Sequence, residues 1–209
     1  MPLPDAILRQ LTLANQLTLL RLAAIPVLAL ALLYGRPGLA LLLFVAAGIT
    51  DRLDGLAARR FGQQTALGAF LDPAADKLLM LVVYIVLSMP DHPRSFPEFF
   101  LAHHVPAWLT LLVITRDLLI VLVSAGLYLH CGVRHFPPTG LGKWTTGFEL
   151  VNAGLFLLAN NLPVMPRWLL LLGVFSTGGI VIVSGLQYLL LIGRRMRALS
   201  GPEEGADEG

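Results

Sequence analysis

The sequence predicts an all-α protein that crosses a membrane several times. The chain has 209 residues, of which 56% are hydrophobic and only 13% are charged. A soluble domain carries about 25% charged residues, so this chain has half the charge that a globular surface of its size needs. Several apolar runs approach the roughly 20 residues that a helical span requires. These observations predict six transmembrane helices and exclude a soluble enzyme, a disordered protein and a nucleic-acid-binding domain.

The first third of the chain is expected to hold a surface helix and two spans. Residues 4–16 have the pattern of a short amphipathic helix that lies on the membrane. The first span follows at 17–34, and glycine and proline predict a turn at 35–38. The second span begins near Leu39, and its helix continues to Arg60 although polarity rises beyond residue 50.

Four further spans complete the predicted bundle. They cover residues 70–89, 108–129, 143–160 and 168–192. Four prolines between residues 90 and 106 exclude a continuous helix there. Gly193 is expected to end the last span. We expect one membrane domain over residues 1–200 and a disordered, acidic tail over 201–209.

The basic residues predict the orientation of the bundle. With the amino terminus inside, nine cations lie at the inner ends of the spans and three at the outer ends. Lysine and arginine are enriched on the cytoplasmic side of membrane proteins. The junction between the second and third spans is therefore expected to face the cytoplasm.

Four acidic residues gather at this junction: Asp51, Asp54, Asp72 and Asp76. Residues three or four positions apart share one face of a helix, so each helix presents a pair of carboxylates. Four like charges in a small volume need cations, and ligands that are all oxygen favour hard ions such as Mg²⁺ or Mn²⁺. Two such ions, held by the four carboxylates, would form a site that stabilises a displacement reaction at a pyrophosphate group.

These acids also have other interpretations. Single acids at helix ends are usually solvated, and the small residues between them also suit tight helix packing. A divalent-cation transporter would use intramembrane acids too, but these would lie near the membrane midplane on several helices. Here the four acids lie on two neighbouring helix ends.

The run from Asp51 to Asp76 resembles the signature of the CDP-alcohol phosphatidyltransferases, DxxDGxxARx₈GxxxDxxxD. Every specified position is present at its required spacing. The resemblance implies that an alcohol attacks the lipid-bearing phosphorus of CDP-diacylglycerol in the membrane and that CMP leaves. It also implies a homodimer and two bound Mg²⁺ or Mn²⁺ ions.

The resemblance also implies roles for individual residues. Asp51, Asp54 and Asp72 would bind metal, and Asp76 would bind metal and act as the general base on the acceptor hydroxyl. The residues expected to line the CDP pocket are Asp51, Gly55, Ala58, Arg59 and Gly68.

Other segments resemble the bacterial phosphatidylglycerophosphate synthase branch, which would place the protein in a bacterial inner membrane. They include Thr18 with Arg21, Arg116 with Asp117, and Lys143. The acceptor of that branch, glycerol 3-phosphate, is a dianion, and Arg116, Lys143 and Arg21 are the cations expected to bind it. A purely structural role for Arg116 would be a pair with a carboxylate, but Asp117 is too close to it in sequence to share its helix face. Cardiolipin synthases, which use phosphatidylglycerol, and other CDP-alcohol phosphotransferases remain alternatives.

Overall fold

The computed structural model describes residues 13–61, 66–93, 95–131, 140–162 and 164–199, in which every regular element is a helix. These helices are α2 (Leu13–Leu33), α3 (Pro37–Phe61), α4 (Ala66–Leu87), α5 (Ala107–Cys131), α6 (Gly140–Ala159) and α7 (Arg167–Leu199). The all-α prediction is therefore confirmed for the described part of the chain.

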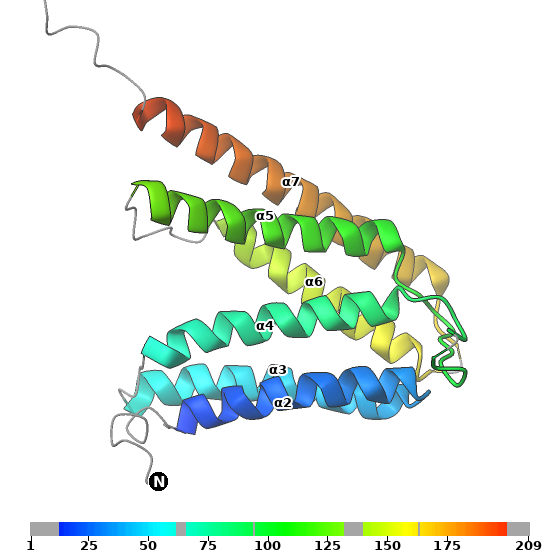
Figure 1. Cartoon of the computed structure of the whole chain (residues 1–209). Coiled ribbons are helices and arrows are strands. Elements are labelled where there is room, and N and C mark those ends of the chain that lie inside the picture. The colour runs from blue at the N-terminus through cyan, green and yellow to red at the C-terminus, as the bar shows by residue number, and fades with distance from the viewer. Residues whose placement is uncertain (1–12, 62–65, 94, 132–139, 163, 200–209) are drawn as a thin grey trace, which may run out of the picture.

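Successive helices run in opposite directions (Figure 1). One end of the bundle, here called the motif end, carries the starts of α2, α4 and α6 and the ends of α3, α5 and α7. The opposite end, here called the loop end, carries the segment between α4 and α5. Helices α4 and α5 lie further apart at the motif end than at the loop end (Figure 1).

The turn between α2 and α3 is fixed by Gly35. Its φ of 66° is the left-handed conformation that glycine adopts without strain. The Gly35 N–H donates to the Leu32 carbonyl at 3.0 Å, and the Arg36 N–H donates to the Ala31 carbonyl at 2.8 Å. These two bonds form a Schellman cap. Pro37 then begins α3, where a missing N–H has no consequence. The predicted turn is confirmed.

Some helix boundaries differ from those predicted. Helix α4 begins at Ala66 rather than near Phe70, and α7 continues past Gly193 to Leu199. One glycine costs a helix only about 1 kcal/mol, and the arginines and alanine that follow are good helix formers. The predicted surface helix at 4–16 and the tail at 201–209 lie outside the described residues, except that residues 13–16 belong to α2.

The exterior of the bundle is apolar on every helix. Leu28, Leu32, Val83 and Leu109 lie in the core with at most 1% of their surface exposed. Large apolar side chains also point outward; examples in chain order are Leu20, Leu42, Leu78, Leu111, Val151 and Phe175. By length and composition alone, two of the described segments could span a membrane, Asn15–Leu33 and Arg167–Leu191.

Candidate active site

Arg21 of α2 lies between two of the predicted aspartates at the motif end. Its Nη1 donates to Asp51 Oδ1 at 2.7 Å and to Asp76 Oδ1 at 3.1 Å. One turn earlier on α2, the Thr18 hydroxyl donates to Asp72 Oδ1 at 2.7 Å. Thr18 and Arg21 reach these partners together because residues three positions apart share a helix face. We call these five residues the carboxylate site.

The carboxylates are open to solvent, whereas the arginine is not. The Arg21 side chain is 1% exposed, but those of Asp51 and Asp76 are 40% and 47% exposed. A guanidinium keeps its charge at every accessible pH, so Arg21 offsets the repulsion between the two carboxylates. The site therefore offers accessible carboxylate oxygens, which are the ligands that hard divalent cations prefer.

Part of the predicted site lies outside the described side chains. The helix backbone of α3 and α4 includes Asp54, Gly55, Ala58, Arg59 and Gly68, but their surroundings are not described. Among the described residues, no three acidic, histidine or cysteine side chains form a compact metal-ligand group. The described oxygen donors, Asp51, Asp72 and Asp76, fit a hard cation by their chemistry.

A second group of charges lies between α4, α5 and α7. Lys77 Nζ is 2.5 Å from Asp117 Oδ2, and Arg116 Nη1 donates to Asp117 Oδ1 at 2.7 Å. Arg116 Nη2 also donates to the Ser184 hydroxyl of α7 at 3.1 Å. We call Lys77, Arg116, Asp117 and Ser184 the cation site. Asp117 thus contacts both cations.

Asp117 pairs with Arg116, although these adjacent residues were not expected to share a helix face, and the expectation that they would not pair was wrong. The rule that adjacent residues diverge describes the directions of their Cβ atoms. The arginine side chain is long enough to curve back over the short aspartate, and a charge-assisted hydrogen bond favours this conformation in a buried setting. The Arg116 side chain is only 6% exposed.

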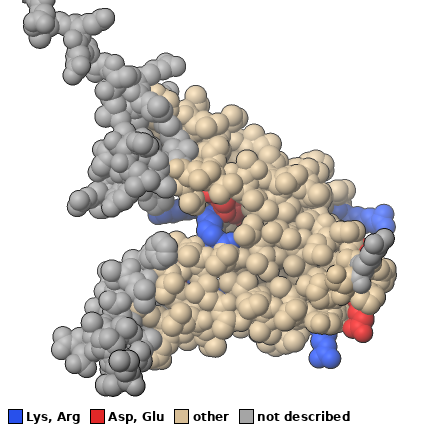
Figure 2. Space-filling model, in the orientation of Figure 1, with Lys and Arg blue, Asp and Glu red and all other residues tan. Residues whose placement is uncertain are grey.

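Helix α4 joins the two sites. Asp76 and Lys77 are consecutive, so their side chains leave α4 about 100° apart. Asp76 contacts Arg21 of α2, and Lys77 contacts Asp117 of α5. Beside Lys77 and Asp117, a mainly apolar cavity of about 230 Å³ lies between α4 and α5. Figure 2 shows side chains of both charges gathered in the hollow between these helices, on an otherwise mostly uncharged face.

Glu149 of α6 is a buried acid that the sequence analysis missed. It is 0% exposed, and neither carboxyl oxygen has a hydrogen-bond partner among the described residues. Lys77 and Arg116 are close enough to attract it electrostatically, and Asp117 is close enough to repel it. Its position inside an apolar run was the available signal, because ionisable residues within membrane helices usually serve a function.

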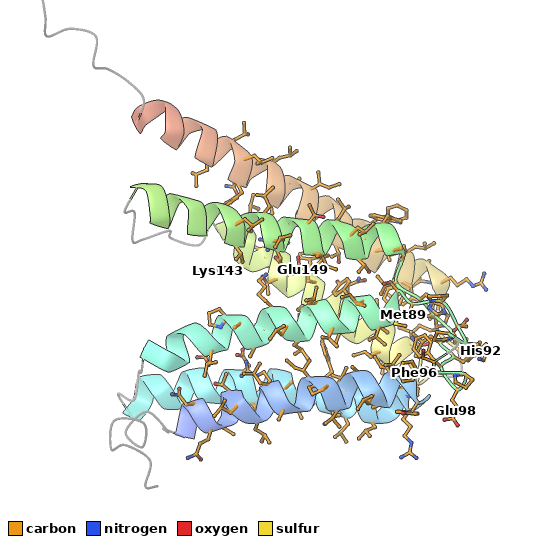
Figure 3. The ribbon with its side chains drawn as sticks, in the orientation of Figure 1. Met89, His92, Phe96, Glu98, Lys143 and Glu149 are labelled. Carbon is orange, nitrogen blue, oxygen red and sulfur yellow. The ribbon has the colours of Figure 1, made fainter. Side chains whose placement is uncertain are left out.

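The surroundings of Glu149 are polar, and Figure 3 shows where it lies on α6 relative to Lys143. The Tyr84 hydroxyl donates to the Glu149 backbone carbonyl at 3.0 Å. Asn152 Nδ2 donates to the Tyr84 oxygen at 3.3 Å. Lys143 lies in the first turn of α6, at the motif end, and is exposed.

An all-helical bundle with a solvent-accessible carboxylate site beside a partly buried cation site has the features of a membrane enzyme that acts on phosphate esters. A family model for CDP-alcohol phosphatidyltransferase matches residues 11–179 of the chain. The chain therefore belongs to the CDP-alcohol phosphatidyltransferase family. This family is membrane-associated, transfers a substituted phosphate group from a CDP-linked donor to an alcohol, and generally uses divalent metal ions.

Proteins that are similar in sequence to this chain are named for two different activities. The chain is 34% identical over 195 residues to a probable phosphatidylglycerophosphate synthase of Mycobacterium tuberculosis, which covers 90% of this chain and 84% of that protein. It is 35% identical over 162 residues to a CMP-forming cardiolipin synthase of Streptomyces coelicolor, covering 73% and 67%. The human CMP-forming cardiolipin synthase is 35% identical over 129 residues, covering 61% and 38%.

Proposed function

We propose that the protein transfers the phosphatidyl group of CDP-diacylglycerol to glycerol 3-phosphate and releases CMP. The observation that carries this proposal is the pair Asp76–Lys77 on α4, which places a carboxylate site and a cation site on adjacent positions of one helix. A donor that needs metal ions and an acceptor that carries its own phosphate require two such sites. The relative from Mycobacterium tuberculosis supports the same acceptor.

The carboxylate site serves the donor in this proposal. Asp51, Asp54, Asp72 and Asp76 would hold two Mg²⁺ or Mn²⁺ ions, which would neutralise the pyrophosphate of CDP-diacylglycerol. The residues that would line the CDP pocket are Asp51, Gly55, Ala58, Arg59 and Gly68. Arg21 contacts Asp51 and Asp76 directly, so we assign it to holding these carboxylates rather than to the acceptor phosphate.

Asp76 is the proposed general base. The acceptor hydroxyl loses its proton to the Asp76 carboxylate while its oxygen bonds to the phosphorus that carries the lipid. The bond from this phosphorus to the bridging oxygen breaks, and CMP leaves with that electron pair. A carboxylate beside cations is a weak base, so Asp76 must act mainly through its position.

The cation site serves the acceptor. Arg116 of this site and Lys143, which lies outside it at the start of α6, are proposed to bind the phosphate of glycerol 3-phosphate. Lys77 is a further cation of the site, because Asp117 contacts both Lys77 and Arg116. Arginine presents a planar pair of donors that matches a phosphate. Asp117 contacts both Arg116 and Lys77 and offsets part of their charge, and the positive charge that remains favours an anionic acceptor.

Cardiolipin synthesis is the second candidate function, with phosphatidylglycerol as the acceptor. The mainly apolar cavity beside Lys77 and Asp117 favours it, since a lipid acceptor needs space for acyl chains next to its phosphate. The relatives named cardiolipin synthase favour it as well.

The same proposal includes the membrane arrangement. All six described helices expose large apolar side chains, as expected of a bundle that crosses the membrane six times. The motif end would then face the cytoplasm, and residues 1–200 would form one membrane domain that assembles as a homodimer. Cysteine accessibility in intact cells tests the orientation, and light scattering in detergent tests the dimer.

An acceptor panel tests the activity. Purified protein with CDP-diacylglycerol and Mg²⁺ is given glycerol 3-phosphate, phosphatidylglycerol, serine or inositol phosphate, and CMP release is measured. We expect CMP and a labelled lipid with glycerol 3-phosphate. Release with phosphatidylglycerol alone would establish the second candidate, and no release with any acceptor would refute both.

A further inference from the structure

A second cavity lies at the loop end of the bundle, whereas the carboxylate site lies at the motif end. Its volume is about 410 Å³, and it lies between the segment that precedes α5, the end of α6 and the start of α7. Arg167, His103 and His104 supply its polar lining. Phe156, Leu170 and Val174 supply apolar lining. A cationic and imidazole rim above an apolar wall suits a ligand that is anionic at one end and apolar at the other.

The charges around this cavity favour an anion. No carboxylate is among its lining residues, all of which the structure describes. The nearby Asp91 accepts a hydrogen bond from the Leu101 N–H at 3.0 Å and contacts His104 Nε2 at 3.1 Å, so this carboxylate is held by the loop and Nε2 of His104 is already engaged with it. Arg167 is exposed and forms a planar, permanently charged donor, which is well suited to a phosphodiester.

The rim of the cavity is held in place before any ligand binds. Asn160 Oδ1 accepts the His103 N–H at 3.1 Å, and Asn160 Nδ2 donates to the His103 carbonyl at 2.9 Å. These bonds tie the segment before α5 to the end of α6. The segment itself closes the loop end, where Figure 3 shows His92, Phe96 and Glu98. A rim that is already ordered loses little entropy on binding.

Two tryptophans place the cavity at the depth of lipid headgroups. Trp108 and Trp168 are 44% and 66% exposed and lie in the first turns of α5 and α7, at the loop end. Tryptophan is enriched where a membrane meets water. From this depth, the exposed apolar side chains of Leu171 and Phe175 continue along α7 toward the membrane interior. A soluble anion would leave this apolar path unused, whereas an acyl chain would cover it.

We propose that this cavity binds an anionic phospholipid in the leaflet opposite the catalytic site. The headgroup phosphate contacts Arg167 and His103, and one acyl chain lies along α7 against Leu171 and Val174. The proposal rests on the membrane arrangement proposed above, but not on the identity of the acceptor alcohol.

The test compares lipid binding by the full chain and two arginine variants. Delipidated protein in detergent is titrated with phosphatidylglycerol or with phosphatidylcholine of the same acyl chains, and bound lipid is counted by native mass spectrometry. We expect Arg167→Gln to weaken the phosphatidylglycerol-selective binding at least about tenfold, because a charge-assisted contact is lost. Arg36→Gln, an exposed arginine at the same end but outside the cavity, should bind as the unmodified protein does.

Three results would overturn the proposal. They are unchanged selectivity in Arg167→Gln, an equal loss in Arg36→Gln, and displacement of the lipid by millimolar inorganic phosphate, which would indicate a site for a soluble anion. Arg167→Gln should also keep its rate of CMP release. A failure of the lipid site is therefore distinguishable from a failure of the proposed enzyme activity, which would abolish CMP release in the unmodified protein.

Discussion

The carboxylate site and the cation site are neighbours on α4, yet they differ in sign and in exposure. Asp51 and Asp76 have side chains that are 40% and 47% exposed, whereas Arg116 and Asp117 are only 6% and 16% exposed. Each site also holds one cation that departs from this pattern, because Arg21 is 1% exposed and Lys77 is 40% exposed. The first site has more acid than base and is open to ions from solvent. In the second, one carboxylate contacts two cations, so a net positive charge remains. Helix α4 contributes to both sites, and the remaining contacts come from α2 and α3 in the first and from α5 and α7 in the second. This difference is the basis of the proposal that the donor and the acceptor bind at different sites.

The largest expected effect is on the carboxylate site. Asp76→Asn should lower the rate of CMP release by about 10²–10⁴-fold, because the amide cannot accept the acceptor's proton. Binding of CDP should change much less, since the contacts with the nucleotide remain. The assay is CMP release at saturating substrates together with CDP binding by calorimetry. Asp91→Asn is the matched control and should keep its rate, and normal turnover in Asp76→Asn would remove this residue from its role.

Arg21→Gln tests whether the charge of Arg21 offsets the repulsion between the Asp51 and Asp76 carboxylates. The variant should lower the free energy of unfolding by about 2 kcal/mol, because two charge-assisted hydrogen bonds are lost. Adding Mg²⁺ should recover much of this loss, since a cation again offsets the repulsion between Asp51 and Asp76. Thermal unfolding in detergent with and without Mg²⁺ measures both effects. Equal stability of Arg21→Gln and the control Arg36→Gln would contradict the account.

Tyr84→Phe probes the polar interior beside the cation site. The variant removes the donor to the Glu149 carbonyl and the acceptor of the Asn152 amide, so we expect a loss of about 1–2 kcal/mol in unfolding free energy. Thermal unfolding should show no such loss in Tyr34→Phe, since that tyrosine is exposed. If both variants are equally stable, the Tyr84 contacts do not contribute to the packing of α4 against α6.

The smallest effect is expected at Asp91, outside both sites. The Leu101 N–H and then His104 hold the pKa of this carboxyl below its ordinary value. A lowered pKa in the folded state stabilises the fold above the pKa of the unfolded state, and this stabilisation disappears as the pH falls through the folded value. Asp91→Asn should therefore be slightly less stable than the unmodified protein at neutral pH. The difference should begin to shrink as the pH falls below about 4 and should disappear once the pH is below the pKa of the folded state. A constant difference at all pH values would contradict this assignment, and Glu98→Gln is the control.

The sequence predicted the helices well because their signal is local. Apolar runs and the turn at Gly35 determine where α2 and α3 meet, and the Asp51–Asp76 spacing predicts two facing carboxylate pairs. The boundary at Gly193 was missed because the residues around one glycine outweigh its helix penalty. A helix boundary of this kind depends on the sum of small free-energy contributions from several neighbouring residues.

The contacts between helices were harder to predict. The bridge from Arg21 to Asp51 and Asp76 joins three helices, and nothing in the spacing along one helix specifies it. The Arg116–Asp117 pair depends on side-chain length, which a rule about helix faces ignores. Glu149 could have been noticed as a charge inside an apolar run, but its nearness to Lys77 and Arg116 depends on how α6 packs.

The most direct test of the division between the two sites measures ligand binding separately in two variants. Asp51→Asn and Arg116→Gln are each titrated with CDP and with glycerol 3-phosphate, in the presence of Mg²⁺. We predict that Asp51→Asn loses affinity for CDP at least about tenfold and keeps that for glycerol 3-phosphate, and that Arg116→Gln does the reverse. If either variant loses both ligands equally, or if Arg116→Gln binds glycerol 3-phosphate normally, the two sites do not divide donor from acceptor.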